Sequence, residues 1–312
     1  MVQAAEGGDV ETFDYIVIGA GSGGMASGRR AAMLGKSVCM IENRVIGGTC
    51  VNVGCVPKKV MFNLANFLEE AHVMKGYGVS GQEGLRLDFP AFKAKRDAYV
   101  ARLNGIYHNN VNKANIRYVE GTASFVSNRV VQVGEQKFTA EHILIASGST
   151  PQNGDFPGIE HCFDSDGFFQ METLPEKCAV IGGGYIGVEL AQILAAFGVK
   201  VTLIVRSIIL RFIDRDVIDV LMANATKLGI DIKLDSPHES VVKNADGTLS
   251  VNLKSGESIQ VNSCLLAIGR PPNVEPLGLQ NTDVVVERSA IKVDEFQNTS
   301  VPGVYAIGDV TN

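Results

Sequence analysis

The strongest constraint on the fold is a run that occurs twice: an apolar strand, a glycine-rich loop, a helix and a second strand. In the first copy an apolar segment at 13–18 leads into Gly19, Gly21 and Gly24, and a helical segment follows at 25–34. In such a G-x-G-x-x-G loop the three glycines allow a tight turn, the approach of a pyrophosphate, and close helix–strand packing. A glycine-rich turn without a ligand is the alternative, but the flanking elements favour a dinucleotide site.

The residue that ends the next strand selects the nucleotide. The second strand of the first copy, at 36–41, ends at Glu42, which lies 23 residues beyond Gly19. An acidic side chain at this place accepts hydrogen bonds from a ribose and disfavours a 2′-phosphate. The first cofactor is therefore predicted to be FAD or NAD.

The second copy has the opposite charge at the same place. A strand at 177–181 leads into the glycine loop, and a helix at 188–197 and a strand at 200–205 follow, with the loop glycines at Gly182, Gly184 and Gly187. That strand ends at Arg206, and Arg211 offers a second cationic donor. Since a cation accommodates a 2′-phosphate, the second cofactor is predicted to be NADPH. An exposed basic loop without a ligand is the alternative.

Two cysteines, Cys50 and Cys55, follow the first copy. Residues five apart in one regular helix have Cα atoms about 8.6 Å apart, whereas a disulfide spans roughly 4.4–6.8 Å. A bridge therefore needs a distorted segment, which Gly54 and Pro57 can provide. Two buried thiols without a bridge are an equally good interpretation of the spacing alone.

Composition excludes several classes of function. The chain has 312 residues, a net charge of −6 and a pI near 5.5, which gives no electrostatic basis for binding nucleic acid. No apolar run reaches the ~18–20 residues of a membrane span, no metal site is predicted, and residues 1–11 are expected to be a disordered leader without a signal peptide. Cys39, Cys178 and Cys264 lie in apolar strands as buried thiols, which suits a reducing compartment such as the cytoplasm.

Four motifs follow one another in a familiar order. They are GGTCVNVGCVPKK at 47–59, GGGYIGVELA at 182–191, AIGRPPN at 267–273 and YAIGDV at 305–310. Together they resemble the flavoprotein disulfide reductases of the pyridine nucleotide-disulfide oxidoreductase family, from residue 13 to the last residue. Within the family the sequence is most similar to glutathione reductases, with thioredoxin–glutathione reductases and thioredoxin reductases as the alternative.

The resemblance implies a route for electrons. NADPH would pass a hydride to FAD, which would reduce a Cys50–Cys55 disulfide. Cys55 would lie against the flavin in a charge-transfer contact, and Cys50 would attack glutathione disulfide. Lys58 would lie beside the flavin and pair with Glu189, and Tyr185 would gate the nicotinamide pocket.

The resemblance also assigns binding residues outside the two loops. Arg29 and Tyr107 would contact glutathione disulfide. Asp309 would be the acid on the flavin side. Further cofactor contacts are expected at Thr49, Gly148 and Gly269.

The sequence departs from the family pattern at its end. The family's acid/base histidine, with its glutamate partner, belongs to a C-terminal interface domain that also forms the homodimer. None of the five histidines here lies in the matching context. We therefore expect that domain to be absent and this chain to be a monomer. A fragment that binds FAD and NADPH but does not turn over glutathione disulfide is the second hypothesis.

The predicted fold is α/β, with two doubly wound Rossmann-like domains and the NADPH domain inserted into the FAD domain. The FAD domain is expected at 12–156 and 294–312, and the NADPH domain at 157–293. Outside the glycine loops, helices are predicted at 60–74 and 89–112.

Overall fold

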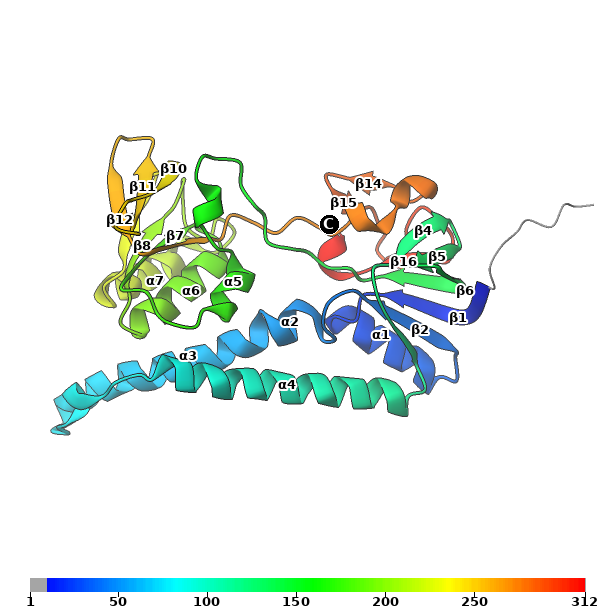
Figure 1. Ribbon diagram of the computed structural model, residues 1–312, viewed down its shortest axis with the longest axis horizontal. Helices are drawn as coiled ribbons and strands as arrows, with labels where there is room; N and C mark the ends of the chain where they lie inside the picture. The colour runs from blue at the N-terminus through cyan, green and yellow to red at the C-terminus, as the bar shows by residue number, and fades with distance from the viewer. Residues whose placement is uncertain (1–9, 312) are drawn as a thin grey trace, which may run out of the picture. The chain divides into compact units, whose positions relative to one another are not determined.

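The computed structural model describes residues 10–311 and divides into two compact units (Figure 1). The first unit contains the chain up to Asn52, Val100–Thr150 and the chain from Pro271 onward, and the second contains Val53–Tyr99 and Pro151–Arg270. The predicted leader at 1–11 lies almost wholly outside the described residues, and the first strand already begins at Val10.

The first unit is built on a mainly parallel sheet. Its strands are β1 (Val10–Ile18), β2 (Val38–Glu42), β3 (Arg117–Glu120), β4 (Ser124–Ser127), β5 (Val130–Val133), β6 (Gln136–Ile145) and β16 (Val304–Ala306). The order is β3-β2-β1-β6-β5-β4, and β16 also pairs with β6. β6 carries two partners along one edge, because its first half pairs antiparallel with β5 and its last three residues pair parallel with β16.

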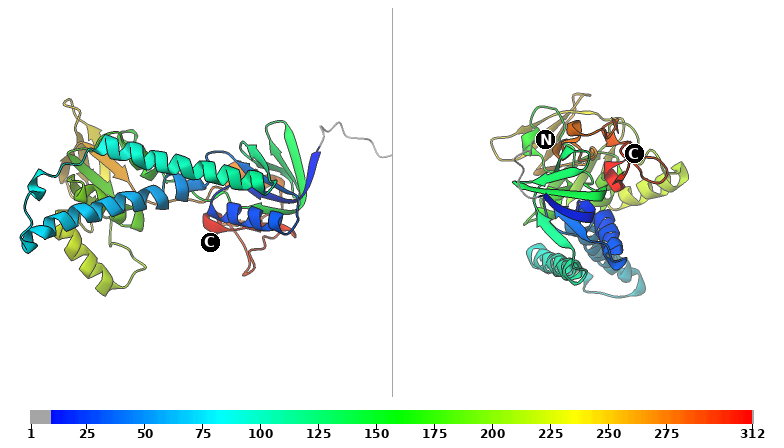
Figure 2. Two further views of the ribbon diagram at one scale, coloured as in Figure 1. Left: turned by 90° about the horizontal axis from the view of Figure 1, so that it is seen from below. Right: turned by 90° about the vertical axis from the view of Figure 1, so that its right-hand side faces the viewer.

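Alternating side chains of this sheet face two different cores. Ile16 and Ile18 of β1 pack with the β4–β5 layer, whereas Val17 packs on the other side with Met25 of α1 (Ser22–Met33). The end of the long helix α4 (Phe89–Lys113) also contributes Val111 to the second core. Figure 2 shows α1 running beside the strands of this unit. This alternation is expected for a sheet covered on both faces.

The remaining elements of the first unit are short. They are helix α2 (Gly48–Asn52), the strands β14 (Val286–Glu287) and β15 (Ala290–Ile291), and 3₁₀ turns at Glu275–Leu277, Leu279–Asn281 and Gly308–Val310.

The second unit has its own parallel sheet of four strands. The order is β13-β7-β8-β9, formed by Ser263–Leu266, Lys177–Ile181, Lys200–Ile204 and Asp231–Lys233. One face is covered by an antiparallel sheet of β10 (His238–Lys243), β11 (Leu249–Leu253) and β12 (Ser258–Val261). A bend at Asn244–Gly247 connects β10 to β11, where the Gly247 N–H donates to the Asn244 carbonyl at 3.0 Å.

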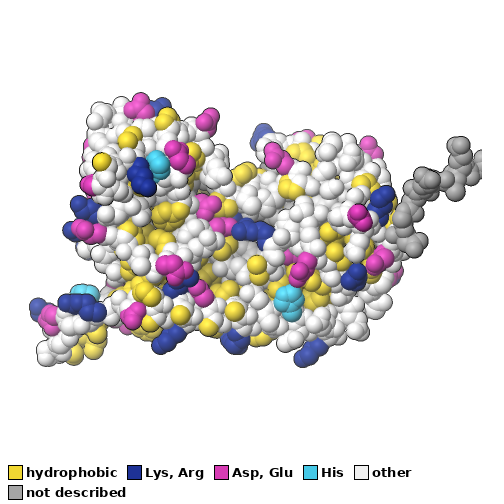
Figure 3. Space-filling view, viewed as in Figure 1, with side chains coloured by type: hydrophobic (Ala, Val, Ile, Leu, Met, Phe, Trp, Pro, Cys, Tyr) yellow, Lys and Arg dark blue, Asp and Glu magenta, His cyan; other side chains and the backbone are white. Residues whose placement is uncertain are grey.

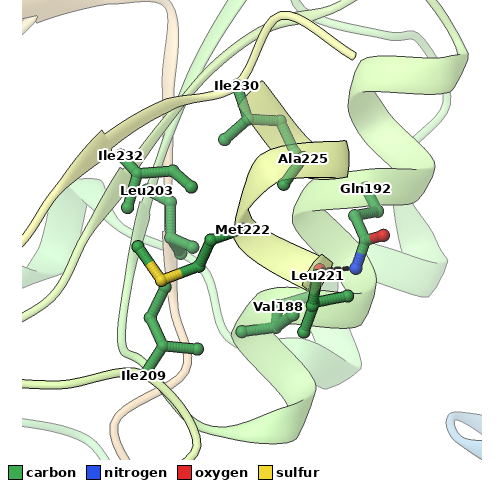
Figure 4. A pocket seen from close by; sticks show the side chains of 9 residues that line it. All are labelled: Val188, Gln192, Leu203, Ile209, Leu221, Met222, Ala225, Ile230 and Ile232. Carbon is green, nitrogen blue, oxygen red and sulfur yellow. Dashed lines mark hydrogen bonds between the residues drawn. The ribbon is translucent and has the colours of Figure 1, made fainter. Parts of the chain in front are cut away.

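Helices cover the opposite face of this second sheet. They are α3 (Cys55–Val73), α5 (Ser165–Gln170), α6 (Tyr185–Ala196) and α7 (Arg215–Lys227), while short 3₁₀ turns lie at Met74–Tyr77, Gln82–Gly84 and Ile159–His161. Figure 4 shows an apolar gap between α6, α7 and the sheet. The polar side chain on its wall is Gln192, whose Nε2 donates to the Val188 carbonyl at 3.2 Å. The gap is a feature of core packing and offers little to a polar ligand.

The predicted elements are confirmed, and α4 begins at Phe89 as predicted, but the starts of three other helices were predicted too late. Helices α1 and α6 begin three residues earlier than the sequence suggests, because the N-caps are Gly21 and Gly184. The last glycine of each motif therefore lies inside the helix. Helix α3 likewise begins at Cys55 instead of residue 60.

The two compact units do not follow the predicted domain boundaries at 156/157 and 293/294 residue for residue. The second unit includes Val53–Tyr99 because Met61 and Ala65 of α3 share a core with Leu190 of α6. The units reflect packing, whereas the predicted domains follow the two nucleotide-binding repeats, and their boundaries stay a prediction.

Within the described residues no helix is both long and apolar enough to cross a membrane. Acidic and basic side chains are interspersed over the face shown in Figure 3.

Candidate functional site

The first glycine loop turns sharply from β1 into α1. Gly19 has a φ of 103°, a conformation that favours glycine, and a Cβ there would lie 2.3 Å from the Ala146 carbonyl oxygen. Gly24 lies in the first turn of α1, where a Cβ would come to 1.9 Å from the Gly19 carbonyl oxygen. Both contacts exclude a side chain, as the predicted roles in turning and packing require.

The middle glycine, Gly21, packs against the start of the cysteine-bearing helix. Gly48 begins α2 with a φ of 61°, and a Cβ there would lie 2.7 Å from the Gly21 Cα. Backbone therefore packs directly on backbone. Apart from its chain neighbours, the nearest described heavy atom to a Cβ at Gly21 would be the Gly48 Cα, at 3.9 Å, so the loop keeps room for a phosphate at the N-terminus of α1.

Glu42 is built into the first loop. Its side chain accepts hydrogen bonds from the Ala20 N–H at 2.7 Å and from the Arg44 N–H at 2.9 Å, and the residue is only 8% exposed. An ionised carboxylate has about four acceptor positions, so two remain for ribose hydroxyls. The same side chain thus ties β2 to the loop and retains acceptor capacity for a nucleotide.

Cys50 and Thr49 lie in α2, where Cys50 is partly buried and Thr49 is exposed. The helix is anchored by Asn52, whose Nδ2 donates to the Gly48 carbonyl at 2.9 Å and to the Ile46 carbonyl at 3.1 Å. Asn104 of α4 donates from its Nδ2 to the Asn52 Oδ1 at 3.0 Å. The sequence analysis assigned no role to these two asparagines, because their pairing joins residues 52 positions apart.

The helical backbone is interrupted between the two cysteines, as a disulfide between them would require. Helix α2 ends at Asn52, Gly54 is the N-cap of α3 with φ −152° and ψ −122°, and Cys55 is the exposed first residue of α3. The predicted distortion is therefore confirmed. The compact units divide at this break, with Cys50 in the first and Cys55 in the second, and the redox pairing itself stays a prediction.

Lys58 and Glu189 form the predicted ion pair. The Lys58 Nζ lies 3.0 Å from the Glu189 Oε1, between α3 and α6, and the two side chains are 24% and 45% exposed. Tyr185 begins α6 one turn before Glu189 and is 64% exposed.

The acid near the end of the chain is held by the end of β6. The Ser149 Oγ donates to the Asp309 Oδ2 at 2.8 Å. Gly148, beside it, has a φ of 68°, and a Cβ there would meet no atom within 4 Å. The strand end is therefore open beside a fixed carboxylate, which is the arrangement expected for binding a polyol chain.

Asn273 from the AIGRPPN motif joins this strand end. Its Nδ2 donates to the Ser147 carbonyl and its N–H donates to the Gly148 carbonyl, both at 2.9 Å. In the second unit, Gly269 of the same motif has a φ of 135° and accepts from the Gln152 N–H at 2.9 Å. Asn273 is a structural residue that the sequence analysis did not single out.

The second glycine loop repeats the first. Gly182 has a φ of 134°, and a Cβ there would lie 2.1 Å from the Ala267 carbonyl oxygen. A Cβ at Gly187 would lie 2.3 Å from the Gly182 carbonyl oxygen, whereas a Cβ at Gly184 would meet nothing within 4 Å. The middle position is again free for a phosphate at a helix N-terminus.

Arg206 follows β8 and has an exposed side chain. The loop that contains it is held by hydrogen bonds from two other arginines. Arg215 donates to the Ile209 carbonyl at 3.0 Å and to the Leu210 carbonyl at 2.6 Å, and Arg211 donates to the Ser207 Oγ at 2.9 Å. The Leu210 N–H donates to the Gly183 carbonyl at 2.8 Å, which joins this loop to the glycine loop. Arg215 is thus a support for the two predicted phosphate ligands.

The charge of Arg206 reaches the start of β10. Burial lowers the pKa of His238, and the positive charges of Lys254 and Arg206 lower it further. Lys254 and Arg206 are therefore the two cations whose charges act on His238.

The two predicted substrate residues belong to the first unit. Arg29 is exposed on α1, and Tyr107 of α4 is half-buried against the core that contains Met25 and Val111. Neither has a role that the contacts alone define.

Two such loops, acidic at one ribose position and basic at the other, are suited to two different dinucleotides. A cysteine-bearing helix packed on the first loop defines the class of two-nucleotide disulfide oxidoreductases. The family model described as pyridine nucleotide-disulphide oxidoreductase matches residues 13–312, and the chain belongs to this family.

Named relatives agree with this class. The glutathione reductase of Schizosaccharomyces pombe is 42% identical over 311 residues, which cover 96% of this chain and 67% of that protein. The glutathione reductase of Yarrowia lipolytica is also 42% identical, with the same coverage of both chains. This chain therefore spans about two thirds of the length of these relatives.

A solved structure shows the same fold. The Cu(II) complex of an HOCl-induced flavoprotein disulfide reductase from Escherichia coli matches with a TM-score of 0.86 and 28% identity, over 97% of this chain and 67% of that one. FAD and NADPH are the cofactors that the family and the glutathione reductases use.

Proposed function

We propose that this chain is an NADPH-dependent disulfide reductase whose substrate is glutathione disulfide. The observation that carries the proposal is the packing of Gly48 on Gly21, which starts the Cys50 helix directly at the first glycine loop. A redox-active cysteine placed beside a dinucleotide loop is what electron transfer to a disulfide requires. The relatives named glutathione reductase support the choice of substrate.

The residues of the two loops would hold the cofactors. Backbone amides at the N-termini of α1 and α6 would bind the two pyrophosphates. Glu42 would accept from the FAD ribose, Asp309 from the polyol chain, and Arg206 with Arg211 would bind the 2′-phosphate of NADPH. Thr49, Gly148 and Gly269 would line these sites.

When bound, FAD supplies the two-electron chemistry that links a nicotinamide to a disulfide. Lys58 would stand at the flavin with its orientation fixed by Glu189, 3.0 Å away. Tyr185 at the exposed start of α6 would cover the nicotinamide pocket until NADPH enters.

The reduced cysteines would then act on the substrate. The Cys50 thiolate attacks one sulfur of glutathione disulfide, forms a mixed disulfide and releases one glutathione thiolate. The Cys55 thiolate attacks the Cys50 sulfur, closes the Cys50–Cys55 disulfide and releases the second. Each released thiolate takes up a proton. The Cys50–Cys55 dithiol and glutathione disulfide thus give the Cys50–Cys55 disulfide and two molecules of glutathione. Arg29 and Tyr107 would orient the substrate.

The compartment is proposed on chemical grounds. Cys39 and Cys178 are fully buried thiols in β2 and β7. Such thiols persist where glutathione is kept reduced, which favours the cytoplasm.

An anaerobic titration with NADPH tests the proposal. The FAD-loaded chain should show flavin reduction and a long-wavelength absorbance that is lost in Cys55→Ser. Cys39→Ala, which changes a buried thiol in β2, should leave the absorbance unchanged. Added glutathione disulfide should then restore the oxidised spectrum.

Two results would contradict the proposal at different points. Failure of NADPH to reduce the bound flavin would exclude the electron donor. Reduction without consumption of glutathione disulfide would leave a cofactor-binding chain without turnover.

A further inference from the structure

The second unit contains another pair of cysteines. Cys162 follows the turn at Ile159–His161, and Cys264 lies in β13. Phe163 forms a parallel bridge with Leu265. The Phe163 N–H donates to the Cys264 carbonyl at 3.0 Å, and this register places Cys162 beside Cys264.

The spacing of neighbouring strands suits a disulfide. Adjacent strands lie about 4.8 Å apart, within the roughly 4.4–6.8 Å that separates the Cα atoms of bridged cysteines. Two backbone hydrogen bonds fix the approach, because the Leu266 N–H also donates to the Phe163 carbonyl at 2.8 Å.

The two side chains also share a face of the sheet. Cys264 belongs to the core between β13 and the β10–β12 sheet, and Cys162 packs against the same core. Cys178 on the adjacent strand β7 belongs instead to the core on the helical face. Cys162 is therefore matched with Cys264 and separated from Cys178.

We propose that Cys162 and Cys264 form a second dithiol, distinct from Cys50 and Cys55, which hydroperoxides oxidise to a disulfide. Nothing in the proposed reduction of glutathione disulfide uses this pair.

The environments of the two thiols give the order of events. Cys162 is partly buried, whereas Cys264 is 0% exposed. A hydrogen bond from the Cys264 thiol lowers the pKa of Cys162, and the same bond together with burial raises the pKa of Cys264 well above its usual value. Cys162 is thus the accessible sulfur with the larger thiolate fraction, and it reacts first.

The chemistry balances with the peroxide as the oxidant. Cys162 attacks the peroxide O–O bond, which breaks to give a Cys162 sulfenic acid and one water. The Cys264 thiol attacks the sulfenic sulfur, forms the S–S bond and releases a second water. Two thiols are oxidised by two electrons in total, and one hydrogen peroxide is reduced to two waters.

Oxidation would join positions near the two ends of Pro151–Arg270, the longer of the two chain segments that form the second unit. The chain begins this segment at Pro151 and leaves it at Arg270. A bond between residues 162 and 264 would close most of it into one covalent loop, including the second glycine loop and Arg206.

Tryptic peptide mapping after oxidation tests the pair on the full chain. Cleavage at lysine and arginine places Cys162 in the peptide 138–177, Cys178 in 178–200 and Cys264 in 255–288. Cys50 and Cys55 share the peptide 45–58, so their disulfide stays within one peptide. After hydrogen peroxide treatment and blocking of remaining thiols, we expect a cross-linked product of 138–177 with 255–288 that a reductant separates.

Alanine variants at three cysteines supply the controls. Cys162→Ala and Cys264→Ala should both abolish the cross-linked product. In Cys264→Ala, Cys162 should be trapped as a sulfenic acid by dimedone. Cys178→Ala, a buried thiol on the opposite face, should give the product in the same yield as the native chain.

Peptide mapping of the native chain tests the proposal even if a variant does not fold. Oxidation of Cys162 to sulfinic or sulfonic acid while Cys264 is still alkylated after unfolding would overturn the proposal. A cross-link from Cys162 to Cys178 would overturn it as well.

Discussion

The two glycine loops pack in the same way. They differ at the charged residue after the second strand of each copy, which is held by hydrogen bonds in the first and exposed in the second. In each, a first glycine packs on a strand end, a last glycine packs on the first, and the middle glycine is left open. Glu42 is almost buried and accepts two backbone hydrogen bonds, whereas Arg206 is exposed. Glu42 is therefore part of the packing of the first loop, whereas Arg206 is a surface side chain of the second.

The largest expected effect tests the shared backbone. Gly187→Ala places a Cβ 2.3 Å from the Gly182 carbonyl oxygen, and we expect a loss of about 3 kcal/mol in the free energy of unfolding. Gly184→Ala has open space and an ordinary φ of −79°, so it should change stability by at most about 1 kcal/mol while weakening NADPH. Denaturant unfolding measures both.

A glycine in an exposed stretch of helix provides the matched control. Gly105→Ala in α4 meets no atom within 4 Å, and it should stabilise by about 0.5–1 kcal/mol. Equal stability of Gly187→Ala and Gly184→Ala would disprove the distinction between packing and binding glycines.

The next prediction compares the contributions of Glu42 and Arg206 to stability. Glu42→Ala leaves the Ala20 and Arg44 N–H groups without their acceptor, and we expect a cost of about 2–4 kcal/mol. Arg206→Ala removes an exposed side chain and should stay within about 0.5 kcal/mol. Thermal and denaturant unfolding of the cofactor-free chain would measure both, and a larger loss from Arg206→Ala would reverse the comparison.

The third test concerns the nucleotide that the second loop selects. Arg206→Glu should weaken NADPH by roughly 10–100-fold, since a hydrogen bond to a charged group contributes about 1.5–3 kcal/mol. NADH binding should change far less. Titration calorimetry with each nucleotide measures the preference, with Lys243→Glu, another exposed cation of the second unit, as the control. An unchanged preference would remove the role of Arg206.

The smallest effect is electrostatic and needs no cofactor. Arg206→Glu should raise the pKa of His238, and Lys254→Glu should raise it more, because Lys254 contributes the larger of the two charge effects. Since the pKa of folded His238 lies below the unfolded value of about 6.5, the unfolded state binds the proton first. Stability therefore falls as the pH drops through about 6.5, and both variants should reduce that fall. Proton NMR of the histidine ring follows the titration, and an unshifted His238 in Arg206→Glu would place the arginine elsewhere.

The sequence pattern predicted the two repeated units well, because the residues that define each unit lie close together in the sequence. Strands, glycine loops, Glu42 and Arg206 all follow from spacing within about 25 residues. The starts of α1 and α6 were predicted too late, since Gly24 and Gly187 resemble loop residues in sequence but lie in the first helical turn.

The supports of the site could not be predicted in the same way. Asn52 with Asn104, Asn273 with Ser147, and Arg215 with the carbonyls of its loop depend on how the chain folds back. An asparagine or arginine in a loop carries no local sign of its partner. The Lys58–Glu189 pair was predicted only through the family resemblance, because 131 residues separate the two side chains.

The late position of β16 has a consequence for synthesis of the protein. The first glycine loop leaves the ribosome early, but the strand beside β6 and the carboxylate held by Ser149 follow only after the whole of Pro151–Arg270. All of Pro151–Arg270 must be translated before the first sheet gains its final strand. Because domains generally fold as they are synthesised, the second unit can order while the flavin site is still incomplete. Tight flavin binding would then mark a chain whose translation has passed β16.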